Sequence, residues 1–266
     1  MDQKKPKKVY VIGHKNPDTD SICSAMVKER LNKKNGYDSS VAVRLGNINK
    51  ETQYVLNYLN LEAPELKEEV AEGQKVIMVD HNEFNQSIKG IEKAKILGVV
   101  DHHRIANFET SDPLYYTARP YGCTSTILFQ DFKGKGIEIN REEAILMASA
   151  IISDTLLLKS PTTTKHDEKA LEELEKIAGI DIKEYGLEML KAGTDLDDFT
   201  AKELINLDAK SLDKNGTKFV IAQVNTVSIE DVLKRKEKLD NIISSYGSNL
   251  IKKEKVLIQY CKKIKQ

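Results

Sequence analysis

VYVIGHKNPDTDSICSA, residues 9–25, joins an apolar run directly to a cluster of ionisable side chains. Residues 9–12 are apolar and mostly β-branched, which predicts a short buried strand. His14, Asp18 and Asp20 follow within seven residues, and a helix is expected to begin immediately after them. Open α/β sheets place their ligands at loops that follow the carboxyl ends of strands. Because carboxylates crowded together repel one another, this stretch predicts a divalent cation between them.

The same arrangement recurs later in the chain, where apolar runs end in aspartate or in aspartate and histidine. The residues concerned are Asp80 and His81 in KVIMVDHN, Asp101, His102 and His103 in ILGVVDHHR, and Asp154 in AIISDT. Because the carboxyl ends of parallel strands meet at one edge of a sheet, we expect these side chains to form one cluster.

Each of these residues also has a purely structural interpretation. A single aspartate at a strand end most often caps a helix or shapes a turn. His81 is the best case for a structural role, since Asp80 can act as a ligand while His81 points away. His166 lies in a polar helix start and is expected to be solvent-exposed. The joint occurrence of four such segments favours a metal centre over four separate explanations.

The donor types restrict the chemistry of this centre. Imidazole and carboxylate without thiolate favour Mn²⁺, Co²⁺, Fe²⁺ or Zn²⁺, with Mg²⁺ as an alternative. Four aspartates and two histidines exceed the needs of one ion, which favours two ions roughly 3.5–4 Å apart with a shared carboxylate. Such a pair lowers the pKa of a water molecule and neutralises phosphate oxygens. The cluster therefore predicts hydrolysis of a phosphoester or phosphoanhydride.

The composition indicates a cytoplasmic globular protein. Of the 266 residues, 40% are hydrophobic and 31% are charged. The 41 basic and 41 acidic residues balance, which gives no support for binding to nucleic acid or to a membrane. The three cysteines are far apart, which favours a reducing compartment over disulfides or a thiolate zinc site. No run approaches about 18 apolar residues, so neither a signal peptide nor a membrane span is expected.

Strand-like and helix-like runs alternate through the first two-thirds of the chain. Short apolar runs predict strands at residues 9–13, 40–46, 75–80 and 96–101. Runs with helical spacing predict helices at residues 23–36, 51–60, 142–155 and 166–180. This alternation predicts an α/β fold with a mostly parallel sheet and helices on both of its faces.

A change in composition near residue 190 predicts a domain boundary. We assign residues 1–190 to a metal-binding catalytic domain and residues 191–200 to a linker. Residues 201–266 are expected to form a smaller, incomplete α/β domain. Its predicted elements are a helix at 201–207, a strand at 218–224 and a helix at 230–247.

Several segments together resemble one known family. GHKNPDTDSICSA, VDHNEFNQS, VDHHRIANFET, GCTSTI and ASAIISDTLLLKSPT are similar to blocks of the family II, manganese-dependent inorganic pyrophosphatases of the DHH phosphoesterase superfamily. The similarity runs almost without a break from about residue 8 to about residue 248. The resemblance implies a first metal held by His14, Asp18 and Asp80, and a second held by Asp20, Asp80, His102 and Asp154. Asp80 would then bridge the two ions.

The resemblance also implies the substrate and how it is held. His103 and Lys210 match catalytic residues that contact the phosphates of pyrophosphate, Lys210 from the second domain. The implied cofactors are two Mn²⁺ ions, which Co²⁺ or Mg²⁺ can replace, and a further Mg²⁺ that arrives with the substrate. The implied assembly is a homodimer formed through the first domain, and the second domain would close over the substrate.

The chain departs from the family pattern after about Asn249. The family's Ser-Arg-Lys-Lys motif, which clamps the phosphates, is not found, and the last arginine is Arg235. The tail, residues 250–266, carries six lysines against one glutamate, and lysine lacks the bidentate fork of arginine. We therefore expect a truncated second domain that impairs hydrolysis while leaving the metal centre complete.

Two alternative functions compete with pyrophosphate hydrolysis. One is a catalytically weak paralogue that binds metal or phosphate, which fits the missing clamp. The other is a DHH phosphodiesterase that acts on short oligonucleotides. The second lacks support, because no glycine-rich GGGH block is present and tryptophan, which could stack on bases, is absent from the sequence.

Overall fold

The computed structural model describes residues 8–194, 200–204, 210–214, 217–221, 234–249 and 255–256. For residues 204, 210–214, 217–221, 243–249 and 255–256 it describes the backbone alone. The chain divides into two compact units, at residues 1–189 and 190–266. Helix α6 (Ile182–Gly193) extends into the segment predicted as a linker, and residues 195–199 of that segment lie outside the described residues.

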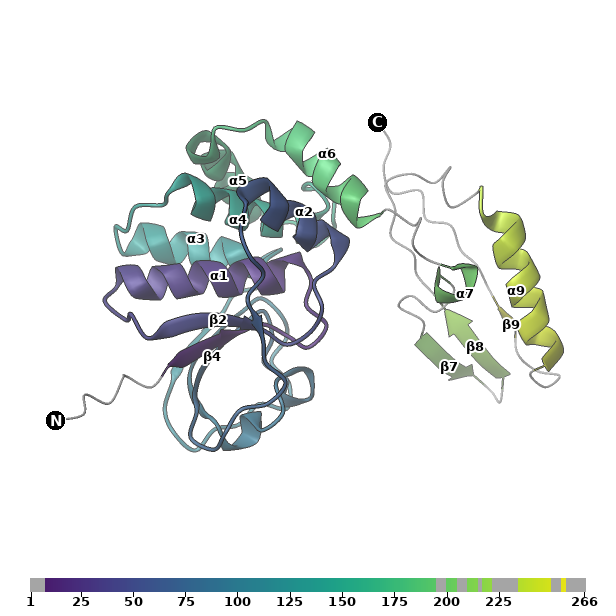
Figure 1. Cartoon of the computed structure of the whole chain (residues 1–266), viewed down its shortest axis with the longest axis horizontal. Coiled ribbons are helices and arrows are strands. Elements are labelled where there is room, and N and C mark those ends of the chain that lie inside the picture. The colour runs from purple at the N-terminus through teal and green to yellow at the C-terminus, as the bar shows by residue number, and fades with distance from the viewer. Residues whose placement is uncertain are drawn as a thin grey trace. The chain divides into compact units, whose positions relative to one another are not determined.

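Six parallel strands form the sheet of the first unit, in the order β3-β2-β1-β4-β5-β6. Figure 1 labels two of them, β2 and β4. The strands are β1 (Val9–Ile12), β2 (Ser40–Arg44), β3 (Glu65–Leu66), β4 (Lys75–Val79), β5 (Lys95–Asp101) and β6 (Tyr115–Ala118). The four predicted strands are confirmed as β1, β2, β4 and β5, whereas the short edge strands β3 and β6 were not predicted. The order reverses between β1 and β4, which is where open α/β sheets form a crevice.

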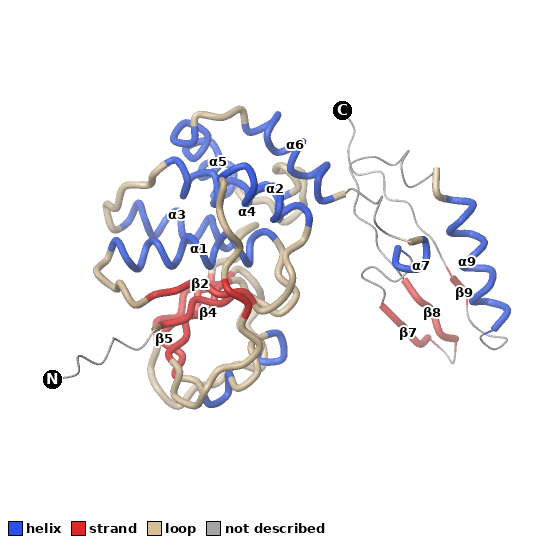
Figure 2. Tube along the Cα trace, viewed as in Figure 1, coloured by secondary structure: helices blue, strands red, loops and turns tan. Residues whose placement is uncertain are grey.

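The long helices of the first unit gather on one side of this sheet (Figure 2). They are α1 (Thr19–Lys34), α2 (Lys50–Leu59), α3 (Thr124–Gly134), α4 (Arg141–Thr155) and α5 (Lys165–Ala178). Helix α1 packs on β1, β2 and β4, and α4 packs on α1 and α5. Residues 143–152 of α4 are all buried, so this helix is the centre of the helical layer.

The opposite face of the sheet is covered differently, and the prediction of helices on both faces is wrong for the described part of the first unit. Two short 3₁₀ segments, η1 (Phe84–Gln86) and η2 (Ile91–Lys93), lie there together with loops. Right-handed crossovers place connections on opposite faces once the strand order reverses. The β4–β5 connection, residues 80–94, therefore reaches the second face, and Gly90 within it has a φ of 86°, which interrupts a helix.

The second unit contains a small sheet and two described helices. Strands β7 (Lys210–Lys214) and β8 (Thr217–Ile221) pair antiparallel, and β9 (Lys255–Val256) pairs parallel to β8. The helices are α7 (Ala201–Leu204) and α9 (Lys236–Asn249), close to two predicted helices. The predicted helix end at 205–207 and strand end at 222–224 lie outside the described residues. Among the described residues, no helix is long and apolar enough to cross a membrane.

Candidate metal centre

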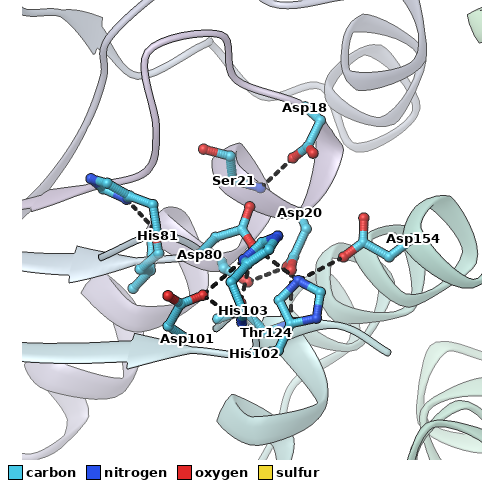
Figure 3. Close-up of polar contacts among 12 residues, drawn as sticks. Asp18, Asp20, Ser21, Asp80, His81, Asp101, His102, His103, Thr124 and Asp154 are labelled. Carbon is cyan, nitrogen blue, oxygen red and sulfur yellow. Dashed lines mark hydrogen bonds and ion pairs between the residues drawn. The ribbon is translucent and has the colours of Figure 1, made fainter. Parts of the chain in front are cut away.

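The six side chains predicted as metal ligands converge above the carboxyl ends of β1, β4 and β5. Figure 3 labels all of them except His14. Two groups of donor atoms share Asp80, and within each group the atoms all lie within 4.8 Å of one another. One group contains His14, Asp18 and Asp80, and the other contains Asp20, Asp80, His102 and Asp154. A third group joins Asp80 and His102 to His103, so His103 also lies within reach of an ion.

The loop from β1 to α1 positions the first donors through close backbone packing. The Ser21 hydroxyl accepts a hydrogen bond from the His14 N–H at 2.9 Å. A Cβ atom added at Gly13 would lie 1.9 Å from that hydroxyl oxygen, so the contact requires glycine. Asp18 caps α1, since its Oδ1 accepts from the Ser21 N–H at 2.9 Å, while its Oδ2 lies 3.5 Å from His14 Nε2. Asp18 is therefore both a helix cap and a donor of the cluster.

Asp80 lies at the centre and is held in a conformation unusual for aspartate. It follows β4 directly, has a φ of 61° and is only 2% exposed. Its Oδ2 lies 3.4 Å from His14 Nε2, and its Oδ1 lies 3.4 Å from His102 Nε2. Oδ2 is buried without a hydrogen-bond partner. A buried carboxylate oxygen without a donor fits a position next to a cation.

The N-terminus of α3 contributes to the cluster, and the sequence reasoning missed this contribution. The N–H groups of Thr124 and Ser125 donate to the Asp20 carboxylate at 2.7 and 3.3 Å, and the Ser24 hydroxyl donates to it at 2.5 Å. The Thr124 hydroxyl donates to Asp80 Oδ1 at 3.1 Å. The positive end of the α3 dipole thus stabilises a fully buried carboxylate.

His102 and Asp154 complete the cluster from the helical side. His102 Nε2 lies 3.7 Å from Asp154 Oδ2, and Asp154 lies in the last turn of the buried helix α4. His102 Nδ1 lies 3.0 Å from the Tyr121 carbonyl oxygen. Because a carbonyl oxygen only accepts, Nδ1 carries the proton and Nε2 faces the carboxylates.

His103 is held by a buried carboxylate that was noted in the sequence but given no role. Asp101 Oδ1 accepts from His103 Nδ1 at 2.9 Å, and Asp101 Oδ2 accepts from the Asn82 amide at 2.6 Å. The hydrogen bond to Asp101 raises the pKa of His103. The His103 side chain is 53% exposed, so its imidazole can reach a molecule bound beside the cluster.

The remaining histidines of the described residues have other surroundings. His81 Nδ1 bonds the Val79 carbonyl at 2.9 Å, and its Nε2 contacts the Ser87 hydroxyl at 3.1 Å, which agrees with the structural role favoured for it. Burial lowers the pKa of His81 to about 4. His166 is exposed as expected, but its ring stacks on Tyr121 with 4.4 Å between centroids.

Crowding of the carboxylates changes how the metal-free cluster holds protons. Burial and the charge of Asp80 raise the pKa of Asp20 to about 6. Burial and the charges of Asp20 and Asp18 raise the pKa of Asp154 well above its ordinary value. Burial would raise the pKa of Asp80 too, but the imidazoles of His102 and His14 hold it well below its usual range. The cluster therefore binds protons where cations would otherwise balance the carboxylates.

Models of known protein families match residues in both units of the chain. Residues 8–151 match the model of the DHH family, N-terminal domain, and residues 187–258 match the DHHA2 domain. A manganese-dependent inorganic pyrophosphatase of Bacillus subtilis (strain 168) is 55% identical over 239 residues, which cover 90% of this chain and 77% of that protein. The chain belongs to the DHH family of manganese-dependent inorganic pyrophosphatases. A probable member from Exiguobacterium sp. is 56% identical, with 89% of this chain and 77% of that protein covered.

One solved structure agrees with this assignment, and a second agrees in fold. A putative family II inorganic pyrophosphatase of Methanococcus jannaschii aligns with a TM-score of 0.73 at 39% identity, covering 90% of this chain and 79% of that chain. An exopolyphosphatase-related protein from Bacteroides fragilis shares the fold alone, with a TM-score of 0.55 at 14% identity over 80% of this chain and 65% of that chain.

Two predictions for the second unit concern side chains that are not described. Lys210 is the first residue of β7, where the backbone is described and the side chain is not. The expected loss of the phosphate clamp concerns the tail after Asn249, of which only residues 255–256 lie within the described part.

Proposed function

We propose that this chain hydrolyses inorganic pyrophosphate to two phosphates at a centre of two manganese ions. The proposed ligands are His14 and Asp18 for one ion, Asp20, His102 and Asp154 for the other, and Asp80 for both. The observation that carries the proposal is the position of Asp80, whose two oxygens each lie 3.4 Å from a different imidazole. One carboxylate thus faces two groups of donors. The manganese dependence named for the similar enzymes supports the choice of ion.

The donor set fits the proposed ions. It offers imidazole nitrogens and carboxylate oxygens, which suit Mn²⁺, and the same donors accept Co²⁺ or Mg²⁺ in its place. Two such ions, when bound, lower the pKa of a water molecule and neutralise the oxygens of a phosphate under attack. We also propose that a further Mg²⁺ arrives with pyrophosphate, whose several negative charges favour a bound cation.

The chain's own residues would act on the charge of the substrate. Asp101 accepts from His103 Nδ1 and raises the pKa of His103, which favours the protonated ring whose Nε2–H donates to a phosphate oxygen. Lys210, from β7 of the second unit, is proposed to bring an ammonium group to the same phosphate. Donors aimed at developing negative charge each contribute roughly 10²–10³-fold to such a reaction.

The assembly and location proposed for this enzyme are a homodimer in the cytoplasm. Among the described residues, edge strand β6 pairs on one side only, and Tyr115 on it is 88% exposed, which suits pairing with a second copy. Light scattering should then give about twice the 30.0 kDa chain mass. Cys23 and Cys123 are buried and free, in keeping with a reducing compartment, and fractionation of the source cells tests the location.

The decisive experiment measures phosphate release from pyrophosphate by the metal-stripped chain during titration with Mn²⁺ and, separately, Mg²⁺. We expect Mn²⁺-dependent turnover that Asp80→Asn lowers at least about 100-fold. Asp38→Asn, which removes an exposed carboxylate elsewhere, serves as the matched control and should keep wild-type turnover. Stoichiometric Mn²⁺ binding without phosphate release would contradict the proposed reaction and favour a binding paralogue.

A further inference from the structure

The peptide group between Tyr121 and Gly122 connects the proposed metal centre to a buried carboxylate on α5. On one side, the Tyr121 carbonyl oxygen accepts from His102 Nδ1 at 3.0 Å. On the other side, the Gly122 N–H of the same peptide group donates to Asp167 Oδ2 at 2.9 Å. Three polar groups therefore lie in series, from the Asp167 carboxylate through one peptide to the His102 ring.

Asp167 has little freedom to move. It is fully buried, at 0% exposure, and accepts four hydrogen bonds. Oδ2 accepts from Gly122 N–H, from Thr164 N–H at 2.8 Å and from the Thr164 hydroxyl at 2.6 Å, while Oδ1 accepts from the Thr126 hydroxyl at 2.6 Å. The contacts at Thr164 belong to the capping box of α5. The helix start thus fixes the carboxylate against the Gly122 peptide.

Gly122 permits this contact because it has no side chain. A Cβ atom there would lie 2.8 Å from Asp167 Oδ2 and 2.9 Å from the Thr155 methyl group. Any larger residue must push the carboxylate away or move the loop. The Tyr121 side chain is held as well, by stacking on His166, the residue before Asp167. The loop is therefore fixed at both the peptide and the ring.

We propose that Asp167 is a positioning residue for His102, acting through the Tyr121–Gly122 peptide, an inference that rests on the proposed metal centre. A carboxylate that accepts from a peptide N–H polarises that peptide and makes its carbonyl a stronger acceptor. The carbonyl then holds the proton on His102 Nδ1 and aims Nε2 at Asp80 and Asp154 (Figure 3). Direct carboxylate partners perform the same task for many metal-binding histidines.

The test uses two changes that break the series at different points and one matched control. Asp167→Asn removes the charge, and Gly122→Ala separates the carboxylate from the peptide. Thr126→Val removes a different hydrogen bond from the same carboxylate, so it matches the structural loss while leaving Gly122 and its partner in place. If Asp167→Asn fails to fold, Gly122→Ala still tests the positioning role of Asp167.

Two readouts separate positioning from simple loss of stability. Histidine-specific ¹⁵N NMR of the full metal-free chain follows exchange of the His102 Nδ1 proton, and only five histidines need to be assigned. Electron paramagnetic resonance of free Mn²⁺ gives the dissociation constants of Mn²⁺ alone. We expect Asp167→Asn and Gly122→Ala to speed Nδ1 exchange and to weaken one Mn²⁺ site about 10- to 100-fold. Thr126→Val should change neither.

The outcomes distinguish this inference from the proposed function. Nδ1 exchange that is equal in the wild type and in both disrupting variants would overturn the positioning role of Asp167, whatever the Mn²⁺ result. An equal effect of Thr126→Val would also overturn it, because general loosening of the loop would then explain the change. Failure of the wild type to bind Mn²⁺ would count against the proposed metal centre. Faster exchange of the His102 Nδ1 proton in Asp167→Asn and Gly122→Ala would still support the positioning of His102 by Asp167.

Discussion

His14 and His102 each face more than one carboxylate, and this decides their protonation in the metal-free protein. Burial alone would lower the pKa of His14, but Asp18 and Asp80 outweigh it and raise the pKa to about 10. For His102, burial is outweighed by Asp80 and Asp20, and the pKa rises to about 9. Both imidazoles are therefore doubly protonated at neutral pH, and the proton on the nitrogen that would bind a metal must leave when the metal binds.

Binding of Mn²⁺ should consequently release protons and strengthen as the pH rises. Between about pH 6 and about pH 9 the dissociation constant of Mn²⁺ should fall, because fewer protons must leave His14 and His102. Calorimetry at about pH 7.5 in two buffers of different ionisation enthalpy counts the released protons. His81 should add none, because its pKa of about 4 leaves it neutral. Binding enthalpies that do not depend on the buffer would contradict this prediction.

At the scale of elements, Glu51 on α2 connects the two helices that carry Asp20 and Asp154 of the cluster. Its Oε1 accepts from the Thr19 hydroxyl at the start of α1 at 2.6 Å and from the Ser153 hydroxyl near the end of α4 at 2.5 Å. Thr19 precedes Asp20, and Ser153 precedes Asp154. Glu51 thus fixes how the ends of α1 and α4 approach each other.

Glu51→Ala should lower the free energy of unfolding of the metal-free chain by about 1–3 kcal/mol, since two hydroxyls lose their acceptor. Urea denaturation followed by circular dichroism measures the change. Glu51→Gln is the matched control, because its amide oxygen can still accept both hydrogen bonds, and it should lose less. Equal stability of the wild type and Glu51→Ala would show that the two helices hold their places without this contact.

Much of the arrangement at this scale can be predicted from local sequence. The runs before Asp80 and Asp101 have the apolar, β-branched character of buried parallel strands. Strands β4 and β5, and the sheet edge at which they end, can therefore be predicted from the sequence. The convergence of their terminal residues follows from the geometry of parallel strands. The helix cap at Asp18 likewise follows from an aspartate placed just before an apolar stripe.

The contributions that were missed depend on residues with no local signal. Thr124 begins α3 after Gly122 and Cys123, and small polar residues there suit a turn as well as a helix start. The bond from its N–H to Asp20 joins residues that are distant in sequence, so only the packing of α3 on α1 reveals it. Asp167 looks like an ordinary capping residue in sequence, and its contact with Gly122 depends on the packing of α5 against α3.

At the scale of the whole first unit, the candidate centre gathers residues from the beginning, middle and end of the sequence of that unit. Native packing brings them into groups that share Asp80, and the donor atoms within each group lie within 4.8 Å of one another, whereas an unfolded chain disperses them. Mn²⁺ should therefore bind the native state and raise its stability by about 2.7 kcal/mol at a free concentration 100 times the dissociation constant. In its absence, the raised pKa values of His14 and His102 contribute to the pH dependence of stability.

The stabilisation by Mn²⁺ should grow from about pH 6.5 to about pH 9. The raised pKa values of His14 and His102 mean that the native metal-free chain binds more protons than the unfolded chain. Their contribution is fully present below about pH 6.5 and is lost as the pH rises toward about 10 for His14 and about 9 for His102. Over the same interval Mn²⁺ binds more tightly, so calorimetric Tm values with and without Mn²⁺ should diverge. Asp80→Asn should abolish the divergence and Asp38→Asn should keep it, whereas a constant Tm difference across this interval would contradict proton displacement at the centre.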